Sequence, residues 1–277
     1  MPPHLDLSSN PLLLAFGALL LAAGLLVYSR LVRQISDSGG KVRTAEFSLP
    51  DLLVCVSLTS TIGWLIATQA LSPAKETPAP INVDQLVPNS LVFVVLVMGI
   101  GAFASYRGLR LSRLVGIAHV STGRAIVVAF GLLLAALPIL WCVGWLTKQA
   151  LQDSMQEQEL VQLFRKVAQN SDSEAILKIV LAGVVIAPLW EEFLFRGYFY
   201  GVFKRYFGSL ASALLTAALF AAFHTNLASL PSLFALALCF TIAYEATGSL
   251  LVPIGMHALF NLTQLAFLYL QATRVAG

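Results

Sequence analysis

Residues 175–197 read AILKIVLAGVVIAPLWEEFLFRG, an apolar run that carries two adjacent carboxylates and an arginine. A helix needs roughly 17–25 residues, at 1.5 Å each, to cross a hydrocarbon core of about 30 Å. A charge inside such a helix costs about 2.5–3.5 kcal/mol on insertion scales, so ionisable residues at this depth usually mark a site. The stretch therefore predicts a membrane helix in which Glu191, Glu192 and Arg196 have specific roles.

The composition of the whole chain also indicates a protein that folds in a lipid membrane. Of 277 residues, 58% are hydrophobic and 11% are charged, against roughly 45–50% and about 25% in soluble domains. This excludes a water-soluble globular enzyme, because one core of this size cannot bury so much apolar surface. The net charge of +3 comes from lysines and arginines in short connections, which favours membrane orientation and argues against nucleic-acid binding.

Apolar windows recur along the chain and predict an all-α, polytopic transmembrane helix bundle of about eight spans. The windows cover approximately residues 11–28, 50–70, 90–106, 125–146, 175–195, 209–225, 231–247 and 249–270. The fifth is expected to continue as helix to about Tyr206, before a hairpin at Gly208. We expect a polar cavity between the last four spans.

The chain is expected to divide into two regions. Residues 1–174 form an N-terminal four-span region, and residues 175–277 form a core of four spans that carries the polar residues. Within the first region, the proline-rich residues 72–90 predict an extended outer loop. Residues 151–170 have the apolar spacing of an amphipathic helix, which could cap a cavity at the interface or rest on the lipid headgroups.

Basic residues orient the predicted spans. Ten of them lie in the connections between spans 1 and 2, 3 and 4, and 5 and 6: Arg30, Arg33, Lys41, Arg43, Arg107, Arg110, Arg113, Arg124, Lys204 and Arg205. By the positive-inside rule these connections face the cytoplasm, and both termini lie outside. A compact chain without long soluble tails or a retention signal suits a multi-pass protein of a bacterial inner membrane.

The two glutamates of span 5 are expected to have different partners, because adjacent residues on a helix point about 100° apart. Glu192 and Arg196 stand at i, i+4 with the acid first, which is the favourable order for an ion pair. This pairing leaves Glu191 to project into the bundle without a local counter-charge. Glu245, at the inner end of span 7, is expected to be a solvated helix end.

Three further polar residues fall within the last spans. His224 ends span 6, while His257 and Asn261 share a helix face at i, i+4 in span 8. Counted from Gly208, Glu191 and His224 lie 17 and 16 residues away, each about 25 Å along its helix. A carboxylate, two imidazoles and an amide are therefore expected at similar depth, where they can line one cavity.

These groups suit hydrolysis of an acyl bond by activated water. A buried carboxylate with an imidazole can take a proton from water, and His257 and Asn261 can donate hydrogen bonds to an oxyanion. The sequence has no obvious serine or cysteine nucleophile motif and no HExxH. A zinc site of Glu191, His224 and His257 remains chemically possible.

The ordered motifs Glu191-Glu192-x-x-x-Arg196, Phe220-x-x-x-His224 and His257-x-x-x-Asn261 resemble the CAAX protease and bacteriocin-processing family (CPBP, or Abi). This family includes the type II CAAX prenyl endopeptidases. The resemblance covers roughly residues 175–270 and implies an intramembrane glutamate protease with residues 175–277 as its catalytic core. It implies that Glu191 and His224 activate water and that His257 and Asn261 stabilise the oxyanion. Glu192, Arg196 and Phe220 would support the site.

The resemblance also implies the partners. It implies no metal or other cofactor, and a substrate that is a peptide or a lipidated protein, such as a prenylated CAAX protein, met in membrane lipid. The oligomeric state and the cleavage site stay open. Two other functions remain to be weighed: a metal-dependent membrane hydrolase, and a non-catalytic bacteriocin immunity or binding protein on the same scaffold.

Overall fold

The computed structural model describes residues 10–71, 82–116, 119–151 and 159–276, and every regular element within these ranges is a helix. Seven helical segments in them are long and apolar enough to cross a membrane. They are α1 (Pro11–Ser38), α2 (Leu49–Leu71), α3 (Val83–Tyr106), α5 (Thr122–Leu151), the continuous stretch Ser173–Phe223, α10 (Leu230–Thr247) and α11 (Leu251–Ala276). The predicted fold class, an all-α polytopic bundle, is confirmed.

The number of long segments is one fewer than the eight predicted windows, because the stretch Ser173–Phe223 contains two of them. It consists of α7 (Ser173–Val180), the π-helical η2 (Leu181–Ile186), α8 (Ala187–Glu192), the π-helical η3 (Phe193–Tyr200) and α9 (Gly201–Phe223). Within α9, Gly208 has a φ of 79° and a ψ of 171°, a conformation that glycine adopts readily. The predicted hairpin at Gly208 is confirmed.

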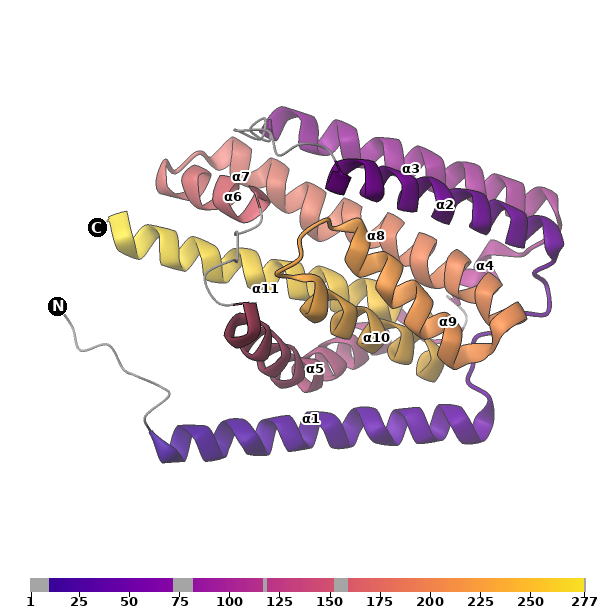
Figure 1. The fold of residues 1–277 in the computed structure, drawn as a ribbon, viewed down its shortest axis with the longest axis horizontal. Helices are drawn as coiled ribbons and strands as arrows, with labels where there is room; N and C mark the ends of the chain where they lie inside the picture. The colour runs from indigo at the N-terminus through magenta and orange to yellow at the C-terminus, as the bar shows by residue number, and fades with distance from the viewer. Residues whose placement is uncertain (1–9, 72–81, 117–118, 152–158, 277) are drawn as a thin grey trace.

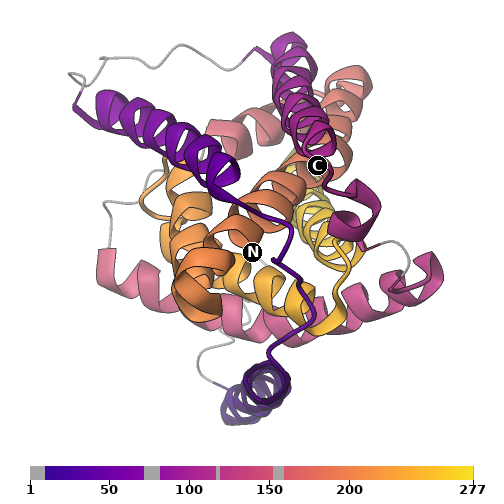
Figure 2. The same ribbon diagram turned by 90° about the vertical axis from the view of Figure 1, so that its right-hand side faces the viewer.

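The chain beyond Gly208 folds back along η3, so two antiparallel arms lie side by side (Figure 1). As a result, the first turn of α1 and the last turn of α11 lie at the same end of the bundle. α10 packs against α9, α5 and α11. Viewed along the bundle, the orange and yellow C-terminal helices lie between α1, α2, α3 and α5 (Figure 2).

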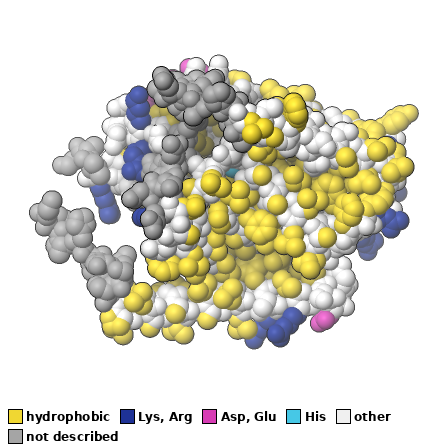
Figure 3. All heavy atoms as spheres, in the orientation of Figure 1, with side chains coloured by type: hydrophobic (Ala, Val, Ile, Leu, Met, Phe, Trp, Pro, Cys, Tyr) yellow, Lys and Arg dark blue, Asp and Glu magenta, His cyan; other side chains and the backbone are white. Residues whose placement is uncertain are grey.

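The outer helices present apolar side chains to the surroundings. In α1 the buried residues are Gly24 and Tyr28, while leucines along the rest of the helix are exposed. In Figure 3, hydrophobic side chains cover the middle of the visible face, and charged side chains gather toward its ends and lower edge. A helix that is apolar on all sides is expected in lipid, since in water this surface would have to be buried.

Two connections differ from the sequence prediction. The predicted outer loop over residues 72–90 was too long, because α3 begins at Val83 and contains Pro88. The side chain of Asn82 accepts a hydrogen bond from the backbone of Asp84 at 2.9 Å, and this cap stabilises a helix start ahead of the proline. Residues 72–81 of that loop lie outside the described residues.

The predicted amphipathic helix is present as α6 (Glu159–Gln169), while residues 152–158 of the predicted range lie outside the described part. Its apolar face is buried against other helices: Phe164 and Val167 pack with Ala175 and Ile179 of α7. α6 also packs along α11. The helix is therefore held by the bundle itself, in addition to any contact with headgroups.

Candidate active site

The two glutamates lie on α8, a short α-helical piece between two π-helical stretches, η2 and η3. π-helical turns within α-helices occur frequently at functional sites. Both glutamates are buried, Glu191 to 6% exposure and Glu192 to 0%. A buried carboxylate is unfavourable unless it is paired, hydrogen-bonded or protonated, so the partners of each glutamate decide its role.

Glu192 accepts two hydrogen bonds from basic side chains on one oxygen. Its Oε1 receives Nη1 of Arg196 at 3.0 Å and Nδ1 of His257 at 2.9 Å. Arg196 also donates from Nη2 to the carbonyl of Ala237 at 3.2 Å. The predicted Glu192–Arg196 ion pair is confirmed. The structure adds the hydrogen bond between His257 and Glu192, which are 65 positions apart in the chain, and this bond joins α11 to α8.

Two phenylalanine rings enclose these charges. The guanidinium of Arg196 lies 4.4 Å from the ring centroid of Phe220 and 5.3 Å from that of Phe240. The imidazole of His257 stacks on Phe240 with centroids 5.2 Å apart. Cation–π contacts of this kind favour one position of the cation in a desolvated site. The ring of Phe220 therefore lies against the basic groups of both η3 and α11.

Glu191 keeps one oxygen free of hydrogen bonds. Its Oε2 is buried, accepts no hydrogen bond from any described residue, and lies 3.9 Å from Nε2 of His257. Both His257 and His224 are close enough to act electrostatically on this carboxylate. α11 thus brings the imidazole of His257 beside Glu191, as expected for polar groups that line one cavity.

His224 lies at the C-terminal end of α9 and is half-buried. Its Nδ1 is 2.8 Å from the carbonyl oxygen of Phe220. A carbonyl can only accept, so Nδ1 carries the proton and donates it. In the neutral ring this leaves Nε2 as the hydrogen-bond acceptor, which is the form that can receive a proton from water.

Asn261 lies one turn beyond His257 on α11. Its Nδ2 donates to the carbonyl of Gly183 in η2 at 2.7 Å. The amide still has a second N–H and its oxygen. The structure gives Asn261 no contact with Glu191 or the two histidines among the described side chains, so its link to them is its place on the face of α11 that carries His257.

An aromatic wall beside the glutamates was not predicted from the sequence. Phe93 of α3 stacks on Trp190 with centroids 4.5 Å apart, and Phe223 meets both rings edge-on at 5.7 and 5.9 Å. Trp190 directly precedes Glu191, which was a signal for an apolar wall here. Nothing local in the sequence marked Phe93, because it reaches the site only through the packing of α3.

Glu245 is buried to 2% exposure, so the prediction of a solvated helix end was wrong. Its Oε1 accepts from the hydroxyl of Tyr200 at 2.6 Å and from the ammonium of Lys204, and its Oε2 accepts from the backbone N–H of Val42 at 3.3 Å. The connection between α1 and α2 covers it, since the backbone N–H of Lys41 donates to the carbonyl of Glu245 at 2.9 Å.

Metal ligation needs several donors that converge on one point. Among the described residues, no group of three or more histidine, cysteine, aspartate and glutamate side chains is arranged to hold a metal ion. Glu191, His224 and His257 therefore do not form such a donor set in this geometry.

Comparison with known proteins places this region in a family. Residues 173–263 match the model of the Rce1-like type II CAAX prenyl endopeptidases. An uncharacterized 24.3 kDa protein of Escherichia coli is 39% identical over 95 residues, which cover 32% of this chain and 43% of that protein. The match thus spans less than half the length of that relative. No solved structure matches the chain closely enough to count as a relative. Residues 173–263, which hold all three motifs, are therefore similar to the Rce1-like type II CAAX prenyl endopeptidases, in agreement with the family that those motifs predicted.

Proposed function

We propose that this chain is a membrane endopeptidase in which Glu191 and His224 activate a water molecule to hydrolyse a peptide bond. The observation that carries the proposal is the contrast between the two glutamates of α8. Glu192 is held by Arg196 and His257 through Oε1, although its own Oε2 is unbonded, whereas Glu191 has no such basic donor and its buried Oε2 accepts no hydrogen bond from the described residues. A buried acceptor of this kind is available to bind a polar substrate or water.

The proposed reaction begins with proton transfer from water. Glu191 takes the proton while Nε2 of His224 accepts a hydrogen bond from the same water, and the oxygen attacks the peptide carbonyl carbon. Collapse of the tetrahedral intermediate breaks the C–N bond. Glu191 then returns its proton to the leaving nitrogen, so the products are a carboxylic acid and an amine.

Oxyanion stabilisation is assigned to His257 and Asn261. Because Nδ1 of His257 donates to Glu192, the second ring nitrogen faces Glu191 and the reacting atoms. A ring protonated at both nitrogens would donate Nε2–H to the oxyanion. The unused N–H of the Asn261 amide would be the second donor. Glu192, Arg196 and Phe220 are positioning residues, since they hold His257 in place.

The proposed substrates are peptides or lipidated proteins, including prenylated CAAX-type proteins, that reach the site within the membrane. The family match supports this class, and the aromatic wall of Phe93, Trp190 and Phe223 is a surface suited to an apolar substrate segment. We further propose a bacterial inner membrane with both termini outside, a topology that fusions of reporter enzymes to each terminus would test.

A peptidomic comparison tests the proposed function. Membranes carrying the intact chain, the Glu191→Ala variant and a matched acidic control, Asp37→Asn on exposed α1, are compared at equal protein levels. We expect cleavage products with the intact chain and the control, and none with Glu191→Ala. Products that persist in Glu191→Ala membranes would contradict the proposal.

Repeating the cleavage measurement with a metal chelator distinguishes the peptidase from the two alternative functions. Loss of cleavage on chelation, restored by zinc, would select a metal-dependent hydrolase. If no product depends on the intact chain but protection against a bacteriocin survives Glu191→Gln, the chain is a binding or immunity protein.

A further inference from the structure

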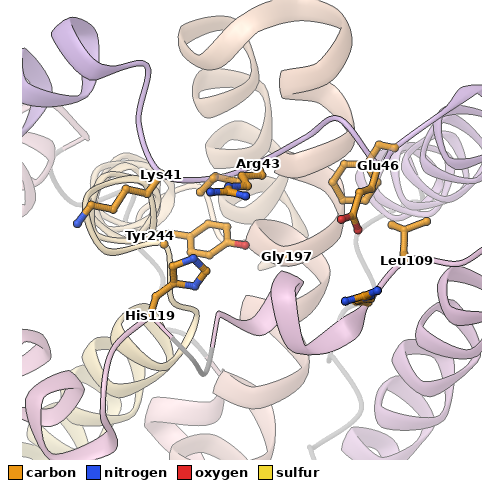
Figure 4. A pocket seen from close by; sticks show the side chains of 11 residues that line it. Lys41, Arg43, Glu46, Leu109, His119, Gly197 and Tyr244 are labelled. Atoms are coloured by element: carbon orange, nitrogen blue, oxygen red, sulfur yellow. The ribbon is translucent and has the colours of Figure 1, made fainter.

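A cavity of about 180 Å³ lies at the end of the bundle where α1 connects to α2, apart from Glu191 (Figure 4). Its wall comes from the α1–α2 connection, the start of the short helix α4 (Leu111–Val115), the segment at His119, η3 and the turn between α10 and α11. This is the end where the basic connections of the predicted cytoplasmic face gather. The proposed peptidase reaction makes no use of it.

Three residues with cationic side chains line this cavity. Lys41 and Arg43 come from the α1–α2 connection, and Arg110 precedes α4. All three are exposed, and none forms an ion pair with another described side chain. The imidazole of His119 adds a further nitrogen, and Glu46 is the acidic residue of the lining. The charge of the lining is therefore positive on balance.

The floor of the cavity is apolar, and the backbone at Gly248 limits its shape. Val42, Phe47 and Leu109 are buried there. Gly248 has a φ of 70°, and a Cβ at this position would lie 3.2 Å from Cβ of Lys41 and 3.7 Å from the ring of His119. A larger residue would thus be strained and would push these side chains. The site is a hollow lined by cationic residues, which distinguishes it from scattered surface charges.

We propose that this cavity binds the phosphate headgroup of an anionic phospholipid. Arginine and lysine are the side chains that bind phosphate oxygens in proteins, and basic pockets between membrane helices on the cytoplasmic side are suited to lipid headgroups. Leu49 and Leu53 of α2 follow the cavity residue Phe47 in the chain and are 59% and 58% exposed. They offer an apolar surface for acyl chains, which a soluble phosphate ion would not need.

The test is a binding measurement and needs no enzymatic readout. The purified full chain is titrated in detergent with phosphatidylglycerol, with phosphatidylcholine and with inorganic phosphate, and bound lipid is counted by native mass spectrometry. The triple variant Lys41→Gln, Arg43→Gln, Arg110→Gln should bind phosphatidylglycerol about 10- to 100-fold more weakly, given the contribution of each basic residue near an anionic lipid. Phosphatidylcholine should bind weakly to every variant.

Two control variants make the result specific. Arg30→Gln, Arg33→Gln, Arg205→Gln removes three exposed cations from the predicted cytoplasmic connections without touching the cavity, and should retain phosphatidylglycerol as the parent does. Lys41→Arg, Arg43→Lys, Arg110→Lys keeps the charge and should retain most of the binding, which also reports correct folding.

Three results would overturn the proposal. Equal loss of phosphatidylglycerol in both charge-removing variants would assign the effect to general surface charge. Unchanged binding in the cavity variant would remove the cavity from any role. Cavity-dependent binding of inorganic phosphate that phosphatidylglycerol does not displace would identify a soluble anion as the ligand instead.

Discussion

The protein has two buried acidic clusters, one around Glu245 of α10 and one on α8, and they differ in how completely their carboxylate oxygens are hydrogen-bonded. In the Glu245 cluster, both carboxylate oxygens accept hydrogen bonds, from Tyr200, Lys204 and the backbone of Val42. In the α8 cluster, one oxygen of Glu192 accepts two bonds, while Oε2 of Glu191 and Oε2 of Glu192 accept none from the described residues.

This difference distinguishes the Glu245 cluster, which we assign to stability, from the α8 cluster, which we assign to catalysis. A fully bonded buried carboxylate fixes the chain segments around it, here the α1–α2 connection against α10 and η3. A buried carboxylate with free acceptor capacity costs stability, and such groups are found at functional sites. We therefore expect substitutions in the Glu245 cluster to lower stability and substitutions around Glu191 to lower turnover.

The largest expected effect on stability is that of Glu245→Gln. The substitution leaves the ammonium of Lys204, which is 11% exposed, without its counter-charge, and breaking a buried pair in this way costs about 3–5 kcal/mol. Thermal unfolding of the purified protein in detergent would show a lowered Tm, while the molecules that remain folded keep their cleavage activity. An unchanged Tm would mean that the cluster is not structural.

Asn261→Ala should act mainly on turnover. Removal of an oxyanion donor lowers kcat by about 10²–10³-fold, whereas the lost hydrogen bond to Gly183 costs about 0.5–1.5 kcal/mol of stability. Steady-state cleavage at saturating substrate measures the first effect and thermal unfolding the second. A lowered Tm with unchanged kcat would make Asn261 a packing contact between α11 and η2.

The double variant Glu245→Gln with Lys204→Met should be more stable than Glu245→Gln alone. Removing both charges leaves neither uncompensated, so a double-mutant cycle should give a coupling energy of about 0.5–3 kcal/mol. Unfolding by denaturant of the parent, both single variants and the double variant supplies the cycle. Strict additivity would show that the two charges do not interact.

Phe220→Leu should have the smallest effect. It removes the ring under the Arg196 guanidinium, a cation–π contact worth about 1–2 kcal/mol when desolvated, and keeps an apolar side chain. A modest fall in Tm with a parallel fall in kcat is expected, because Arg196 positions Glu192 and hence His257. Phe203→Leu, in the same core away from the charges, is the control and should change stability alone.

The sequence was sufficient to predict features that depend only on residues close together in the chain. The Glu192–Arg196 pair follows from i, i+4 spacing, and the hairpin at Gly208 follows from a glycine between two apolar windows. The contact of His257 with Glu192 could not be derived in this way, since it depends on how α11 packs against α8. The sequence placed both residues in the last four spans but could not predict the hydrogen bond between them.

Long-range packing also explains the errors. Glu245 was expected in solvent because it ends a helix, and it is buried because a connection more than 200 residues earlier in the chain covers it. Pro88 was read as loop, but the cap at Asn82 begins a helix before it. The aromatic wall depends on Phe93, which no local pattern connects to Trp190.

The most direct measurement compares Glu191→Gln with Glu245→Gln on one substrate peptide. Cleavage rate per folded molecule and Tm are measured on the same preparations. We predict that Glu191→Gln lowers the rate by at least about 100-fold with a Tm close to that of the parent, and that Glu245→Gln lowers the Tm with the rate per folded molecule retained. If Glu191→Gln keeps the parental rate while folded Glu245→Gln loses it, the assignment of chemistry to Glu191 and structure to Glu245 is wrong.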